Sequence, residues 1–174
     1  MEALKEIYKE FDNVQVIIFM NTRSFAVTLM NILKKSGYEA KLLMGGDMST
    51  EERDEILRQF RAGSIHFLIT TNLLARGIDV DGMSFVVNFD VPFYKDRNGL
   101  PVADPETYLH RIGRTGRFNT KGIAVTLIDT KKGGDRDIKI LRDIENEFKM
   151  KVQELKDIKK ELFPIAQEHL GLES

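Results

Sequence analysis

The sequence predicts an α/β fold built on a doubly wound parallel sheet flanked by helices. Five short apolar runs alternate with helical patterns along the chain: VQVIIF (14–19), AKLLM (40–44), IHFLIT (65–70), FVVNF (85–89) and IAVTLI (123–128). The apolar residues run together within most of these segments, which is typical of strands buried on both faces. Because strands and helices alternate, we expect parallel βαβ units with right-handed crossovers.

Capping signals and helical periodicity locate the helices between these strands. Ser49 and Glu52 have the spacing of a capping box, and Asp104 followed by Pro105 is a favourable helix start. Two further helices are indicated by apolar residues at helical spacing, which are Phe25, Leu29, Ile32 and Leu33 in one and Ile138, Leu141, Ile144 and Phe148 in the other. The polar stretch YKDRNGLPVAD (94–104) predicts an exposed loop.

Length and composition favour one domain. The chain has 174 residues, of which 42% are hydrophobic and 30% charged, and this is enough for one α/β core but not for two full domains. We therefore expect a single domain over residues 1–174. Within it, residues 1–13 are expected to form a linker or helical lead-in, and residues 150–174 a C-terminal helical extension.

Charge and cysteine content narrow the function classes. The net charge is −1, so any contact with nucleic acid must come from a local patch rather than from a general basic field. The absence of cysteine excludes disulfides and thiolate metal sites, and the three histidines lie far apart, so we expect no bound metal. Because no signal peptide or membrane-length apolar run is found, we expect a soluble, intracellular protein. We also expect it to be a monomer.

Polar segments follow four of the predicted strands at the point where each strand ends. They are NTR (21–23), GGD (45–47), TTN (70–72) and FDVP (89–92). Ligands of open parallel sheets bind beyond the carboxyl ends of the strands. The sequence therefore predicts one functional edge that all four segments share.

The segment TTNLLARGID (70–79) contains groups suited to a nucleotide or a nucleic-acid backbone. Thr71 and Asn72 offer hydroxyl, amide and backbone N–H groups to sugar and phosphate oxygens. Gly77 permits close backbone approach, and Asp79 can accept hydrogen bonds from ribose hydroxyls. The alternative is an ordinary strand-to-helix turn in which Asp79 caps the helix.

The segment HRIGRTGR (110–117) gathers three arginines, at positions 111, 114 and 117, beside a histidine and two glycines. Guanidinium groups are permanently charged, so crowding them is unfavourable unless an anion arrives, and phosphate is the obvious anion. The alternative, a solvated basic helix face, does not explain the glycines or the histidine. We therefore interpret all three arginines as groups that await a phosphate.

Together these segments resemble the second RecA-like domain of a DEAD-box RNA helicase. IIFMNTR resembles motif IV of that family, TTNLLARGID motif V and HRIGRTGR motif VI, in the family's order, and the likeness runs from about Val14 to Phe148. His110 at the head of motif VI favours the DEAD-box group over its DEAH relatives. The stretches VVNFDVP and DPETYLHRIGRTGRF further resemble the subfamily that acts in mRNA export at the nuclear pore.

The resemblance implies roles in the nucleotide site for four residues. Arg114 and Arg117 match the contacts to the γ-phosphate of ATP, with Arg117 as the arginine finger. His110 matches the residue that bridges to the partner domain, and Asp79 matches the ribose contact. With Gly77, they make up the nucleotide-binding and catalytic candidates.

The resemblance also implies an RNA track. Thr22, Gly46 and Thr71 match positions along the RNA backbone, and Arg76 matches an arginine at the domain interface or RNA. Thr50 stands where many relatives have the glutamine of a Q-x-x-R element, which leaves Arg53 alone. The RNA-binding candidates are thus Thr22, Arg23, Gly46, Arg53, Thr71, Asn72 and Arg76, although at the start of a helix Arg23 has a second interpretation as a solvated side chain.

The chain lacks part of what ATP hydrolysis needs. It has no G-x-x-x-x-G-K-[ST] loop to cradle phosphates and no acidic pair at a strand end for Mg²⁺. We therefore expect ATP and Mg²⁺ to be held by an N-terminal RecA-like domain of the same protein, and the isolated chain to be inactive. RNA is a further expected partner, and the export-subfamily likeness implies an activator with inositol hexakisphosphate.

Two alternatives differ in class from a helicase. A non-catalytic RNA-binding or adaptor domain would never hydrolyse ATP, but the near-neutral charge argues against tight independent RNA binding. An NAD-binding Rossmann domain requires G-x-G-x-x-G after the first strand, which is absent here.

Overall fold

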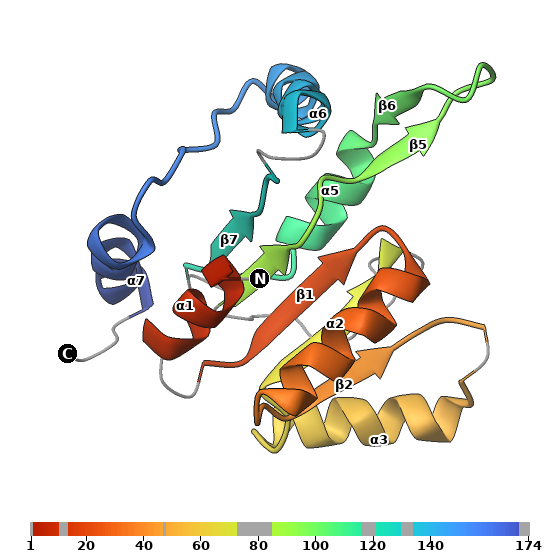
Figure 1. Cartoon of the computed structure of the whole chain (residues 1–174), viewed down its shortest axis with the longest axis vertical. Helices are drawn as coiled ribbons and strands as arrows, with labels where there is room; N and C mark the ends of the chain where they lie inside the picture. Colours follow the sequence, from red (N-terminus) through yellow and green to blue (C-terminus); the bar gives the residue numbers. More distant parts are fainter. Residues whose placement is uncertain are drawn as a thin grey trace.

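The central element of the molecule is a five-stranded, wholly parallel sheet in the order β2-β3-β1-β4-β7 (Figure 1). In this computed structural model, residues 2–10, 14–46, 48–72, 85–115, 121–129 and 134–170 are described. The strands are β1 (Val16–Met20), β2 (Ala40–Leu43), β3 (Phe67–Thr71), β4 (Phe85–Asn88) and β7 (Ile123–Thr126). All five strands predicted from the apolar runs are confirmed.

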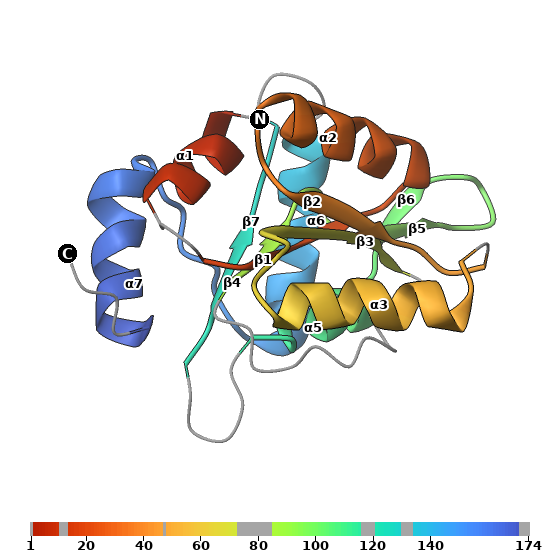
Figure 2. The same cartoon turned by 90° about the horizontal axis from the view of Figure 1, so that it is seen from below.

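Helices flank the sheet, as the doubly wound fold requires. They are α1 (Glu2–Glu10), α2 (Arg23–Lys35), α3 (Thr50–Arg61), α5 (Pro105–Ile112), α6 (Gly134–Phe148), the short π-helix η1 (Ile158–Leu162) and α7 (Phe163–Leu170). α2 lies over one face of the sheet, and α3 and α5 lie on the opposite face (Figure 2). In the part of the chain that the structure describes, no helix is long and apolar enough to cross a membrane.

The predicted helix starts are confirmed at the level of individual hydrogen bonds. The Glu52 amide donates to Ser49 Oγ at 3.1 Å, and the Ser49 amide donates to a Glu52 carboxylate oxygen at 2.9 Å, which completes the capping box of α3. Asp104 accepts the Thr107 amide at 2.9 Å, with proline at the first position of α5. These local signals fix where both helices begin.

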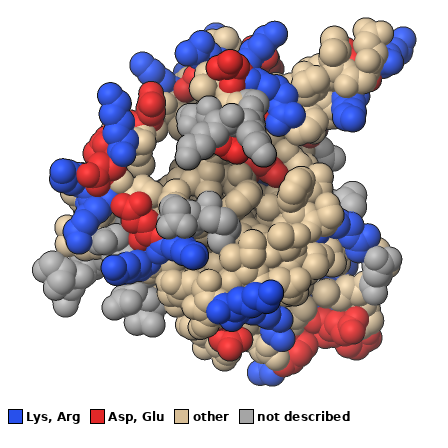
Figure 3. Space-filling view, in the orientation of Figure 1, with Lys and Arg blue, Asp and Glu red and all other residues tan. Residues whose placement is uncertain are grey.

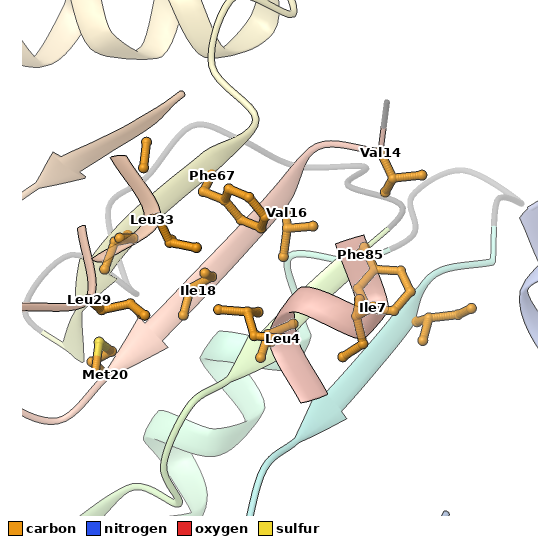
Figure 4. Packing of buried hydrophobic residues seen from close by; sticks show 14 of the residues in the cluster. Leu4, Ile7, Val14, Val16, Ile18, Met20, Leu29, Leu33, Phe67 and Phe85 are labelled. Atoms are coloured by element: carbon orange, nitrogen blue, oxygen red, sulfur yellow. The ribbon is translucent and has the colours of Figure 1, made fainter. Parts of the chain in front are cut away.

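The core has two layers because the central strand alternates its side chains. Val16, Ile18 and Met20 enter the cluster on the α2 face, whereas Ile17 and Phe19 enter the cluster on the α3 face. The first cluster also contains Leu4 and Ile7 of α1 and Leu29 and Leu33 of α2 (Figure 4). It further contains Leu162 and Ala166 of the C-terminal helices, so both ends of the described chain help to build the core.

The predicted inner face of α2 is wrong by about one position. Leu29 and Leu33 are buried as expected, but Phe25 is 65% exposed and Ile32 is 37% exposed, while Ala26 is buried in their place. Ala26 allows the helix backbone to approach the sheet closely. The bulkier Phe25 is therefore left on the solvent side.

Part of the predicted exposed loop at 94–104 is in fact a β-hairpin. β5 (Phe93–Lys95) pairs antiparallel with β6 (Pro101–Ala103), and the hairpin projects away from the sheet (Figure 1). The Asp96 side chain accepts the amides of Asn98 and Leu100, each at 2.8 Å, and these two bonds set the turn. Side chain-to-backbone bonds of this kind give order to a polar sequence that lacks strand periodicity.

Candidate functional site

The polar segments that follow the strands lie at one edge of the sheet, as predicted. The strands are in parallel register, with Val16 of β1 level with Phe67 of β3 and Phe85 of β4. Their carboxyl ends therefore point to the same edge, which is also where the hairpin emerges (Figure 1). We call this edge the rim.

A single buried arginine lies at the centre of the rim. Arg111 of α5 is 0% exposed, and its Nε donates to Asn72 Oδ1 at 3.0 Å. Its Nη1 donates to the Asp90 carbonyl at 2.8 Å and to Asn88 Oδ1 at 3.4 Å, and its Nη2 donates to Asn21 Oδ1 at 2.8 Å and also to Asn72 Oδ1. An Asp90 carboxylate oxygen lies 3.5 Å from Nη2. One side chain thus contacts the ends of β1, β3 and β4.

The interpretation of Arg111 as a group awaiting phosphate is therefore wrong. A guanidinium has five N–H donors, and those of Arg111 make five hydrogen bonds within the protein. The Phe19 ring also lies beneath the guanidinium, 5.7 Å from ring centroid to Cζ. The acceptors around Arg111 and the Asp90 carboxylate already compensate its charge. Arg111 therefore does not repel Arg114 in the way that a free guanidinium group would.

A signal for this burial is present in the sequence. Arg111 lies three and four residues after Tyr108 and Thr107, and all three face the protein interior from α5. Its partners Asn21, Asn72 and Asn88 are asparagines at or just after the ends of buried strands. Of these, sequence reasoning singled out Asn72 alone, and for RNA rather than for Arg111.

The network continues beyond the arginine to β7. Asn88 Nδ2 donates to the Thr126 hydroxyl at 3.2 Å, and that hydroxyl is also 3.2 Å from the Tyr108 hydroxyl. On the other side, Asn72 Nδ2 donates to Asn21 Oδ1 at 3.4 Å. The side chains of these asparagines, of Thr126 and of Tyr108 thereby satisfy one another, which favours a single arrangement of the rim.

Burial dominates the protonation behaviour of the Arg111–Asp90 pair. Burial lowers the pKa of Arg111 to about 10, against the opposing effect of Asp90, so the arginine remains charged at neutral pH. Burial also raises the pKa of the Asp90 carboxyl above its ordinary value. Two groups act to lower this pKa: the Asn21 amide, which donates to Asp90 Oδ2 at 2.9 Å, and the Arg111 guanidinium.

His110 and Arg114 lie beside Arg111 on α5 and at its end, but they are partly open to solvent. The Arg114 Nε donates to the His110 carbonyl at 3.3 Å, so the two candidates are held next to each other. Between them, a Cβ added to Gly113 would lie 2.9 Å from the Leu109 carbonyl, which explains sterically why glycine is required there. α5 therefore turns one arginine inward and leaves the next partly exposed.

Three of the RNA-binding candidates are exposed on the rim. Thr22 and Arg23 stand at the start of α2, and an Arg23 Nη2 donates to the Gly45 carbonyl at 3.3 Å, which joins the loops after β1 and β2. Gly46 is exposed with a φ of 96°, a left-handed conformation that favours glycine. The Arg23–Gly45 bond therefore brings these exposed positions near one another.

The other described RNA candidates are less accessible. Arg53 is partly buried on α3, and Thr71 is buried at the end of β3. Asn72 is partly buried, and its side chain is engaged with Arg111 and Asn21. Arg76, Gly77, Asp79 and Arg117 lie outside the described residues.

Comparison with known proteins decides the family. Residues 1–119 match the family described as Helicase conserved C-terminal domain. The solved C-terminal domain of the DEAD-box protein Dbp5 superposes with a TM-score of 0.77 and 39% identity, over 96% of this chain and 89% of that one. The chain is a DEAD-box helicase C-terminal domain.

In longer relatives, the part that matches this chain makes up less than half of the protein. ATP-dependent RNA helicase DDX19A of Bos taurus is 44% identical over 154 residues, which are 88% of this chain and 30% of that protein. Saccharomyces cerevisiae Dbp5 bound to RNA and ADP BeF3 gives a TM-score of 0.81 and 40% identity, over 97% of this chain and 41% of that one. The chain thus spans about a third of its curated relative.

The described part of this DEAD-box domain offers no metal centre. Within the described ranges, no three His, Cys, Asp or Glu side chains come together as potential ligands of a metal ion. The rim presents positive charge and hydrogen-bonding groups, from Arg114 and from the start of α2.

Replacing Asp90 should alter how the stability of the domain depends on pH. Because the carboxyl has a higher pKa in the folded protein, the folded state binds more protons, and the free energy of unfolding falls as pH rises from 3.8 through the raised folded value. The difference in free energy of unfolding between wild type and Asp90→Asn should therefore be largest in acid, and it should decline to a constant value as the pH rises. Urea unfolding at a series of pH values measures this difference, and a difference that grows with pH would contradict the raised pKa.

Proposed function

We propose that this chain is the C-terminal RecA-like half of an ATP-dependent DEAD-box RNA helicase. The observation that supports this best is the rim itself, where α5 presents His110 and Arg114 on the same edge that exposes Thr22, Arg23 and Gly46. A phosphate-facing group and a backbone-facing surface on one edge suit a domain that closes onto ATP and RNA together.

In this proposal the domain supplies charge stabilisation rather than a complete catalytic centre. Arg114 and Arg117 contact the γ-phosphate of an ATP held with Mg²⁺ by the N-terminal domain, with Arg117 as the finger, and Asp79 and Gly77 lie along the ribose. Phosphoryl transfer depends mainly on such positioning and electrostatic stabilisation. His110 bridges to the N-terminal domain in the closed state.

The RNA track runs along the loops after β1, β2 and β3. Thr22, Arg23 and Gly46 are accessible in the structure, and Arg53, Thr71, Asn72 and Arg76 complete the proposed contacts. On the face seen in Figure 3, Lys and Arg are interspersed with Asp and Glu, and the net charge of the chain is −1, so we expect local contacts with RNA rather than a broad basic field. Binding by this domain alone is accordingly weak, and closure with the N-terminal domain supplies the rest.

The similarity to Dbp5 also suggests a cellular setting. A C-terminal domain of S. cerevisiae Dbp5 has been solved with Gle1 and IP6, and longer Dbp5 also with Nup159. We infer that the full protein acts in mRNA export at the nuclear pore, with an activator that uses inositol hexakisphosphate. The main alternative is an RNA-binding or adaptor domain without ATPase activity.

The isolated 174-residue chain should show no RNA-stimulated ATPase activity, whereas the full-length protein should show it. RNA binding by the isolated chain should be weak and fall steeply with salt, because few phosphate contacts act without a basic field. ATPase assays and RNA titrations at several salt concentrations test both statements, with circular dichroism as a control for folding. Tight, salt-resistant RNA binding by the isolated chain, together with an inactive full-length protein, would favour the adaptor instead.

A further inference from the structure

Arg111 occupies the place in the sheet where a ligand usually binds. The connection from β1 leads through α2 to β2 on one side, whereas the connection from β4 leads through α5 to β7 on the other side. The direction of winding therefore reverses between β1 and β4, and in open α/β sheets this switch point forms the binding crevice. Here the Arg111 guanidinium fills it, with Asn21 after β1 and Asn88 at the end of β4 as its partners.

The segments that Arg111 joins are those with the proposed ligand contacts. Asn21 directly precedes Thr22 and Arg23, the candidates for RNA, and its side chain also donates to the Val91 carbonyl at 2.8 Å. Asn72 directly precedes the segment that contains Arg76 and Asp79. Arg111 itself belongs to α5, between His110 and Arg114, so one side chain links the RNA side of the rim to the ATP side.

The chemistry of the link makes it rigid. A guanidinium is planar, with donors in a fixed fork, so five simultaneous bonds define both the distance and the orientation of the groups around it. Buried hydrogen bonds are stronger than exposed ones, and leaving any of them unmade is unfavourable. The ends of β1, β3 and β4 therefore cannot shift relative to one another without breaking part of this set.

We propose that Arg111 is a positioning residue that couples RNA binding to ATP hydrolysis by holding the ends of β1 and β3 in register with α5. This inference rests on the proposed function. Arg111 touches neither RNA nor nucleotide, since its donors are all used internally. When RNA fixes the loop that contains Thr22 and Arg23, the network transmits that position to His110 and Arg114.

The test uses the full-length protein with Arg111→Lys, Asn21→Ala and two matched controls. Lysine keeps the charge but not the planar fork, and we expect the RNA-saturated kcat to fall about tenfold or more. Asn21→Ala removes the bond between the β1 loop and the guanidinium, together with the bonds of Asn21 to Val91 and Asn72, and leaves Arg111 itself in place. It should raise the RNA concentration for half-maximal stimulation about tenfold, while kcat at saturating RNA stays within about threefold of wild type.

The controls separate positioning from general loss of stability. Ile144→Ala removes a buried side chain of α6 that packs in the same cluster as Tyr108 of α5, so it weakens the packing of α5 without removing a hydrogen bond of Arg111. Asn31→Ala changes an exposed asparagine of α2. At a temperature where all variants are folded by circular dichroism, both controls should retain the RNA dependence and kcat of wild type. If Arg111→Lys also retains them, or if Ile144→Ala loses activity to the same extent, the coupling role is overturned.

Hydrogen exchange on the same proteins keeps the inference distinct from the proposed function. The Asn21 amide, which donates to Asp90, should exchange faster in Arg111→Lys than in wild type. In Ile144→Ala its exchange rate should be the same as in wild type. Absence of RNA-stimulated ATPase in wild type would defeat the proposed function, and this exchange rate would then decide alone whether Arg111 holds the rim. Unchanged exchange in Arg111→Lys would overturn the inference whatever the ATPase result.

Discussion

Arg111→Met should lower the free energy of unfolding by about 3–5 kcal/mol, because it removes the buried cation of the Arg111–Asp90 pair together with five hydrogen bonds. Methionine approximates the length of the arginine stem but leaves the Asp90 carboxylate without a counter-charge. It also removes the donor from the side-chain oxygens of Asn72 and Asn88, and leaves the Asn21 oxygen with the Asn72 amide alone. Urea unfolding followed by circular dichroism at neutral pH measures the loss.

Arg114→Met, one turn further along, is the matched control. Arg114 is partly exposed, and substitutions at such sites usually change stability by less than about 1 kcal/mol. Adding Asp90→Asn to Arg111→Met should recover part of the loss, since it removes the uncompensated charge. A single Arg111→Met variant that is as stable as Arg114→Met would show that the network contributes little to folding.

Under the proposed function, Arg117→Ala in the full-length protein should lower kcat by about 100-fold or more. An arginine finger meets charge that develops on the γ-phosphoryl oxygens only after the domains close, so it acts mainly on the chemical step. Known fingers contribute about 10³- to 10⁵-fold in rate. Steady-state ATPase assays at saturating RNA and ATP test this, and RNA binding without nucleotide should stay nearly unchanged.

Two further variants make the Arg117 test specific. Arg117→Lys should recover little activity, because an ammonium group does not reproduce the planar guanidinium fork. Arg58→Ala removes an exposed arginine of α3, whose carboxylate partner is Glu55, and should leave kcat unchanged. A kcat for Arg117→Ala within about threefold of the Arg58→Ala value would end the finger assignment.

Several features of the molecule follow from local sequence because their causes are local. The strands were predictable because buried parallel strands require continuous apolar runs, as in residues 16–20 and 67–69. The starts of α3 and α5 were predictable because Ser49 and Asp104 bond to amides only three residues away. The rim followed in turn, since parallel strands bring their carboxyl ends to one edge.

Other features depend on neighbours that are distant in sequence. The helical pattern near the start of the chain does not reveal that Leu4 packs with Leu162, because that contact exists only once both ends of the chain lie on the same sheet face. The sequence does not predict the hairpin of β5 and β6. Its order comes from Asp96 and from cross-strand pairing, not from hydrophobic periodicity.

The arginines of HRIGRTGR show the division most clearly. By itself the sequence determined that α5 is a helix and that it follows the fourth strand, and it predicted that the arginines in and after this helix await a phosphate. The tertiary structure decided that Arg111 is not one of the groups left for a phosphate. The physical reason is that a buried charge must find its partners, and those of Arg111 are 21 to 90 residues away, at the ends of three strands that only the folded sheet brings together.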